Sequence, residues 1–226
     1  MRTLCGALLL AIVAAPLALK DATAAAQQDV TARLAGRVPP DVATLVRQLA
    51  TSAAARGLPV DPLIQKAIEG SAKGVPVDRV ATALRALVAQ LDVAAAALRD
   101  AAPAQPDTDA IAAGAFALNA GLSSRNVTEL AAASRPSNSV AATLRVASTL
   151  AAMGVPPGQT VELVTQTIEA GGSPTDVLAL PMQVMAGVSQ GSGRGVTPAQ
   201  AAAGLARAAA ARANAPGQSR PKPPHP

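Results

Sequence analysis

Glycine followed by leucine or valine, and then by proline, serine or threonine, recurs along this chain and constrains its fold more than any other feature. Glycine adopts the left-handed backbone conformation that ends a helix, the apolar residue folds back onto the last turn, and proline prevents continuation. The pattern therefore predicts short helices joined by tight connections. It occurs at Gly57-Leu58-Pro59, Gly74-Val75-Pro76, Gly121-Leu122-Ser123, Gly154-Val155-Pro156 and Gly195-Val196-Thr197, with looser versions at Gly36 and Gly172.

Side chains suited to capping mark the starts of these helices. A cap directly before a proline at the first helical position stands at Asp61-Pro62, Ser173-Pro174 and Thr197-Pro198. Gln200 completes a capping box with Thr197, and Asp176 takes the same place after Ser173. Similar starts are expected at Asn126, which precedes Glu129, and at Ser137.

Apolar residues between these marks repeat at helical spacing, and no stretch sustains the alternation of a strand. Alanine, the best helix former, makes up about a quarter of the chain. The predicted fold class is therefore all-α, with about nine to ten short helices after a signal peptide. Pro181 should kink or split the ninth. The expected ranges are 28–35, 40–56, 61–72, 77–100, 107–120, 124–133, 137–153, 159–170, 174–190 and 197–214.

Short connections make successive helices antiparallel, so we expect an irregular array of antiparallel helical hairpins over residues 27–214. An open array and a closed bundle are both compatible with the sequence. The Ala- and Pro-rich residues 101–106 are the expected seam between two halves. Residues 215–226 are expected to form a disordered Pro-rich basic tail.

Residues 1–26 have the pattern of a secretory signal peptide: a basic start, an apolar run and small residues. Cleavage is expected to leave Ala25 or Gln27 as the first residue, and Cys5 would be lost with the signal. The apolar run contains Pro16 and is shorter than a membrane span needs. We therefore expect a periplasmic or secreted protein that is not an integral membrane protein once processed.

Composition argues against several kinds of partner. The chain has no Trp or Tyr, and its one aromatic residue is Phe116, so base stacking is not available. The formal net charge is +5. The cations are scattered singly, as at Arg47, Arg85, Arg99, Arg145 and Arg207, whereas a nucleic-acid footprint is usually clustered. No nucleic-acid partner is expected.

The sequence yields no catalytic, cofactor-binding or metal site. His225 is the one histidine, and it stands in the expected tail, so neither zinc nor a histidine base is expected. Glu162 and Glu169 share a predicted helix face that Glu129 could approach, but a solvated polar face is the favoured interpretation. The segment Gly191–Gly195 lacks the features of a phosphate-binding loop and is interpreted as a connector.

Two longer segments support a resemblance. The stretch from Gly57 to Gly70, continuing through Lys73-Gly74-Val75-Pro76, resembles uncharacterised exported Ala-rich helical proteins of high-GC Gram-negative bacteria. Looser likeness extends to Ala112-Ala113-Gly114-Ala115 and Gly154-Val155-Pro156-Pro157. The resemblance implies export and a helical fold, and it implies no activity and no catalytic residue.

These observations favour a non-enzymatic exported helical protein that acts as a structural or protein-interaction module, with an envelope protein as partner. The first alternative is a basic envelope-binding protein that docks on anionic lipid or polymer through its arginines and tail. The second is a carboxylate-dependent hydrolase.

Overall fold

The computed structural model describes residues 28–102, 105–134 and 138–214, and most of these residues are helical, with no strand among them. The prediction of an all-α fold of about ten helices is confirmed. The expected signal peptide and the expected tail lie outside the described residues. A first helix covers 28–34, followed by α2 (Pro40–Ala55), α3 (Asp61–Ala72), α4 (Val77–Ala101), α5 (Thr108–Asn119), α6 (Ser124–Ala133), α7 (Val140–Ala152), α8 (Pro157–Glu169), α9 (Pro174–Gln190), the short 3₁₀ turn η1 (Ser192–Arg194) and α10 (Pro198–Ala213).

The chain divides into two compact units. Unit 1 is formed by residues up to 56 together with 60–85, and unit 2 by 57–59 together with the chain from 86 onward. The division falls inside α4. The seam predicted at 101–106 lies where α4 ends, and it includes two residues outside the described part of the chain.

Unit 1 has a small aliphatic core. The first helix, α2 and α3 each place apolar side chains at helical spacing toward the others, and the first half of α4 adds two more. Without aromatic rings, this core relies on branched side chains and on close packing of alanine. Its buried members include Val30, Leu34, Val42, Val46, Ala50, Ala53, Leu63, Ile64, Ala67, Val80 and Leu84.

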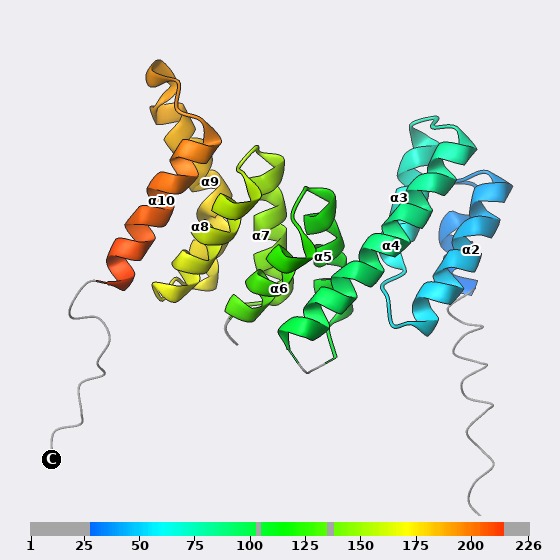
Figure 1. The fold of residues 1–226 in the computed structure, drawn as a ribbon. Coiled ribbons are helices and arrows are strands. Elements are labelled where there is room, and N and C mark those ends of the chain that lie inside the picture. The colour runs from blue at the N-terminus through cyan, green and yellow to red at the C-terminus, as the bar shows by residue number, and fades with distance from the viewer. Residues whose placement is uncertain (1–27, 103–104, 135–137, 215–226) are drawn as a thin grey trace, which may run out of the picture. The chain divides into compact units, whose positions relative to one another are not determined.

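Unit 2 is an open array in two layers. From α5 to α10, each helix packs on the helix that follows it and on the next but one, so α7 lies between α5 and α9, and α8 between α6 and α10. Figure 1 shows these helices following one another along the unit. No more distant pair in this part of the chain has more than marginal contact. Within unit 2, the choice between an open array and a closed bundle is therefore settled in favour of the open array.

The glycine pattern ends helices as expected. Gly74 has φ +65°, and Val75 donates its N–H to the Gly70 carbonyl at 2.9 Å, which is the Schellman arrangement. Gly154 has φ +89°, and Val155 bonds to Leu150 in the same way. One position was predicted wrongly, because Gly171 rather than Gly172 has the positive φ. The glycines with positive φ are Gly36, Gly57, Gly74, Gly121, Gly154, Gly171 and Gly195.

The helix start at Thr197 has the predicted capping box with Gln200, and Ser173 also forms a capping box, with Asp176 as its partner. At α6 the cap was predicted three residues too late. Ser123 is the cap, and Asn126 is its capping-box partner within the helix. Helix α7 is capped by Ser139 instead of Ser137, which is not among the described residues.

Three prolines and one aspartate affect where α8 and α3 begin and how α9 continues. Pro156 and Pro157 start α8 two residues early, since proline suits the first helical position. Pro181 does not split α9, which continues through it to Gln190. Asp61 is not a cap: Val60 holds the cap position, and the Asp61 carboxylate accepts a hydrogen bond from Arg33.

Helix α4 is the one helix in the described ranges that is long and apolar enough to cross a membrane, judged by length and composition alone. Core helices of soluble proteins meet the same criterion. Seven of its residues are buried in the protein: Val80, Leu84, Leu91, Ala94, Ala95, Ala97 and Leu98.

Candidate functional site

A groove of about 300 Å³ opens between the first helix and the second half of α2 in unit 1. The alanines on the α2 side leave its space open, because each presents only a methyl group. Its floor contains the buried residues Val30 and Ala50, and Val60 also lines it. The lining is therefore apolar inside, with charged groups around it. The full lining is Asp29, Val30, Arg33, Arg47, Ala50, Thr51, Ala54, Ala55, Val60 and Asp61.

Arg33 joins two of the elements that line this groove. Its guanidinium donates to the carboxylate of Asp61 at the start of α3 and lies 3.5 Å from Asp29, one turn before it on the same helix. The hydrogen bond to Asp61 raises the pKa of Arg33, so this residue is charged at any pH of interest. Arg33 is thus neutralised by two carboxylates and is held in place.

Arg47, on the α2 side of the groove, is held differently. Its guanidinium donates to the hydroxyl of Thr44 at 3.0 Å, one turn earlier on α2. Among the described residues no carboxylate pairs with it. A hydroxyl partner leaves the positive charge uncompensated and leaves further N–H donors of the guanidinium for a ligand.

A second candidate surface is the exposed side of α9 in unit 2. Leu178, Met182 and Met185 are 56%, 78% and 52% exposed, although all three are large apolar residues. Their spacing of four and then three residues places them in one stripe along the helix. The buried residues of the same helix, Val177, Leu180 and Val184, form a different face. We call Leu178, Met182 and Met185 the α9 stripe.

The α9 stripe lies on an almost uncharged helix. In the 17 residues of α9 the one charged side chain is Asp176. Its carboxylate accepts hydrogen bonds from the backbone N–H and the hydroxyl of Ser173, at 2.8 and 2.7 Å, within the capping box. The hydroxyl bond is the main reason that the pKa of Asp176 is lowered. Charge is therefore confined to the first turn, away from the stripe.

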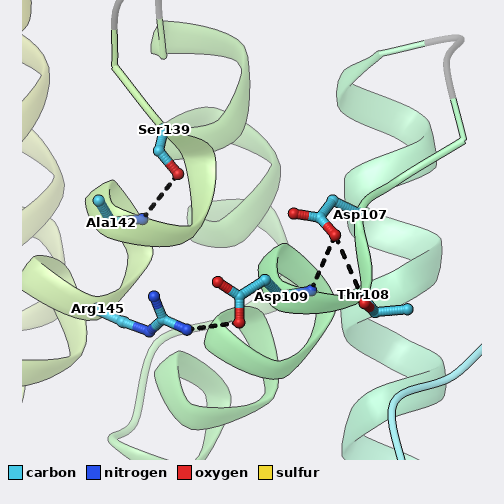
Figure 2. Close-up of polar contacts among 6 residues, drawn as sticks. All are labelled: Asp107, Thr108, Asp109, Ser139, Ala142 and Arg145. Carbon is cyan, nitrogen blue, oxygen red and sulfur yellow. Dashed lines mark hydrogen bonds and ion pairs between the residues drawn. The ribbon is translucent and has the colours of Figure 1, made fainter.

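The layer to which α9 belongs also contains α5 and α7. Figure 2 shows the polar contacts at the starts of α5 and α7 and between these two helices. Asp107 caps α5 by accepting from the N–H of Asp109 at 3.3 Å, and Ser139 caps α7 through the N–H of Ala142. Arg145 reaches from α7 to Asp109 on α5. This pair of helices therefore has an exposed ion pair on its surface, although Phe116 of α5 is also 47% exposed.

The carboxylates considered for catalysis lie on the surface. Glu162 and Glu169 are exposed on α8, and Glu129 is exposed on α6. Glu162 accepts a hydrogen bond from Gln166, one turn later, at 3.3 Å. None of the three lines the groove.

The other candidates from the sequence add no site. Ser192–Arg194 is a 3₁₀ turn that connects α9 to α10 and ends at Gly195. His225 lies outside the described residues. Within the described ranges, no group of three or more His, Cys, Asp or Glu side chains is placed to hold a metal ion.

Sequence reasoning missed both the groove and the α9 stripe. The groove depends on a contact between Arg33 and Asp61, which are 28 residues apart, and no local pattern signals it. The stripe left a signal, since Leu178, Met182 and Met185 are spaced as one helix face. That signal is ambiguous because Val177, Leu180 and Val184 form a second apolar face of α9.

No protein-family model matches this chain, and comparisons with curated proteins and with solved structures also found no match.

Proposed function

We propose that this protein is a non-enzymatic, exported protein-interaction module that docks a helix of another envelope protein on the α9 stripe. The observation that carries the proposal is the exposure of three large apolar side chains in one row. Soluble proteins expose single apolar residues commonly, but a contiguous apolar row is typical of a surface that another molecule covers.

The chemistry of the stripe favours an amphipathic helix as its partner. Anchors at positions i, i+4 and i+7 match the side-chain rows of a second helix packed against the first. Two of the three anchors are methionine, whose flexible side chain adapts to the shape of a partner. Because the stripe has no charge, a partner gains by burying apolar surface and has no ionic contact to make there.

The open array of unit 2 supports the same function. Helices that pack only on near neighbours leave long outer surfaces uncovered, which is how helical repeat proteins present binding faces. The alternative of docking on anionic lipid or polymer needs a cluster of cations. The arginines noted in the sequence are spread over α2, α4, α7 and α10. Two arginines of the described residues, Arg33 and Arg145, are paired with aspartates.

Site-specific photo-crosslinking in cells that export the protein tests this proposal. A photo-reactive residue at Met182 should give an adduct with one discrete protein. The same residue at Gln183, exposed on another side of α9, should not. The adduct should disappear when Leu178→Glu and Met185→Glu are introduced together, provided the variant keeps its helical circular dichroism spectrum.

Three results would contradict the proposal. Adducts of equal yield at Met182 and Gln183 would mean that α9 meets other proteins by chance. An adduct with a second copy of this chain would mean that the α9 stripe mediates self-association and does not bind a different protein. Adducts with lipid alone would favour the envelope-surface alternative.

A further inference from the structure

The groove of unit 1 combines an apolar interior with an ordered arrangement of charge. Val30 and Ala50, which are buried, form its floor, and Ala54 and Ala55 line its wall without filling it. The hydroxyl of Thr51 donates to the backbone carbonyl of Arg47 at 2.9 Å, so the wall offers apolar contact along most of its length. A ligand that fits here has an apolar body.

The charges differ between the two sides of the groove. On one side, Arg33 lies between Asp29 and Asp61, so the three groups together have a net negative charge. On the α2 side, Arg47 has a positive charge that no described carboxylate neutralises. An anionic head group is therefore repelled by the first side and attracted to Arg47, which fixes the direction in which such a ligand lies.

We propose that this groove binds a medium-chain carboxylate, with its hydrocarbon chain over Val30 and Ala50 and its carboxylate on the Arg47 guanidinium. The volume sets the length of the chain. If each methylene or oxygen occupies roughly the 30 Å³ of a water molecule, about ten such groups fill the groove. Octanoate has that size, and its planar carboxylate suits the fork of N–H donors on arginine.

Binding is measured with the protein purified as cells produce it, by two-dimensional NMR titration with hexanoate, octanoate and decanoate. Each added methylene should tighten binding by up to about fourfold until the groove is full, and the gain should then stop near octanoate. The shifted resonances should come from the first helix, from Arg47 to Ala55, and from Val60. 1-Octanol and octylamine, which have the same chain without the negative head, should bind more weakly than octanoate.

Two substitutions test the two halves of the site. Arg47→Gln should weaken octanoate binding by about five- to tenfold, while Arg85→Gln, at an exposed arginine of unit 1 that does not line the groove, should leave it unchanged. Ala54→Leu should abolish binding by filling the space. Ser52→Leu adds a larger side chain to the same helix away from the groove and should not change it.

Octylamine binding as tightly as octanoate would overturn the role of Arg47, and so would equal affinity of the Arg47→Gln and Arg85→Gln variants. Affinity that keeps rising past decanoate, or shifts spread over both units, would mean nonspecific adsorption of detergent-like molecules and would overturn the site itself. The α9 stripe is in the other unit, so these results leave the proposed docking function untouched.

Discussion

The guanidinium of Arg145 on α7 donates to the carboxylate of Asp109 on α5 at 2.7 Å, and this contact joins two helices that are not consecutive in the chain. In unit 2 each helix packs on the next helix but one in the chain, and this ion pair is one of the contacts between such helices. Both side chains are more than half exposed. Because water screens an exposed ion pair, we expect the buried residues beside it to supply most of the stability of this contact between α5 and α7.

The first prediction separates these two contributions with neighbouring residues of α7. A double-mutant cycle on Arg145 and Asp109 should give a coupling of only about 0.2 to 1 kcal/mol, because water screens an exposed ion pair. Leu144→Ala removes a fully buried side chain and should cost about 2 to 5 kcal/mol. Urea denaturation measures both. A coupling as large as the Leu144 effect would mean that the ion pair, and not packing, holds α5 against α7.

The second prediction concerns the glycines that end helices. Gly74→Ala and Gly154→Ala should each destabilise the protein by roughly 1 kcal/mol, because a side chain is strained at their positive φ. No atom lies within 4 Å of the added methyl group at either site, so conformational strain accounts for the loss. Unchanged or increased stability in urea would mean that these residues are not left-handed.

Gly114 and Gly204 provide the matching test inside helices. From the sequence, Gly114→Ala is expected to stabilise α5 unless close packing leaves no room for the methyl group. The structure shows that packing is close: the new Cβ would lie 3.0 Å from the Cβ of Ala94. Gly114→Ala should therefore fail to stabilise. Gly204→Ala, in open space on α10, should gain about 0.5 to 1 kcal/mol.

The third prediction is a dependence on acid at the start of α9. The pKa of Asp176 is lowered in the folded protein, so its contribution is fully present above the unfolded pKa of about 4 and is lost as the pH falls through the lower, folded pKa. Asp176→Asn should keep the cap, as Asn126 does at the start of α6. It should also remove this part of the pH dependence.

Melting temperatures of the wild-type protein and of Asp176→Asn, measured from pH 5 downward, check this prediction. The wild-type protein should be the more stable at pH 5, and its advantage should shrink below about pH 4. Parallel curves for the two proteins would show that the Asp176 carboxylate does not stabilise the fold.

The starts and ends of helices could be predicted closely because the signals are local. Ser173 with Asp176, and Gly154 with Val155, need only neighbours in the chain to form a cap or a Schellman ending. The misassignments were local too. Gly171 and Gly172 both allow a helix to end, and the sequence does not say which of two adjacent glycines takes the positive φ.

Features that depend on tertiary packing could not be predicted in this way. Asp61 has the sequence context of a helix cap, but its carboxylate accepts a hydrogen bond from Arg33 on another helix. Helix α9 has two apolar faces, and only the packing of its neighbours decides that Leu180 is buried and Met182 exposed. The groove and the α9 stripe both depend on how helices pack on one another.

The claim that this protein acts through an uncharged apolar stripe is tested most directly by the salt dependence of its complex. The partner identified by crosslinking at Met182 should remain bound at about 0.5 M NaCl, where charge interactions are screened within a few Å. Met182→Glu should release it, whereas Gln183→Glu, which adds the same charge to another side of α9, should not. Release of the partner by salt, or equal loss with both variants, would contradict the account and favour attachment through charge.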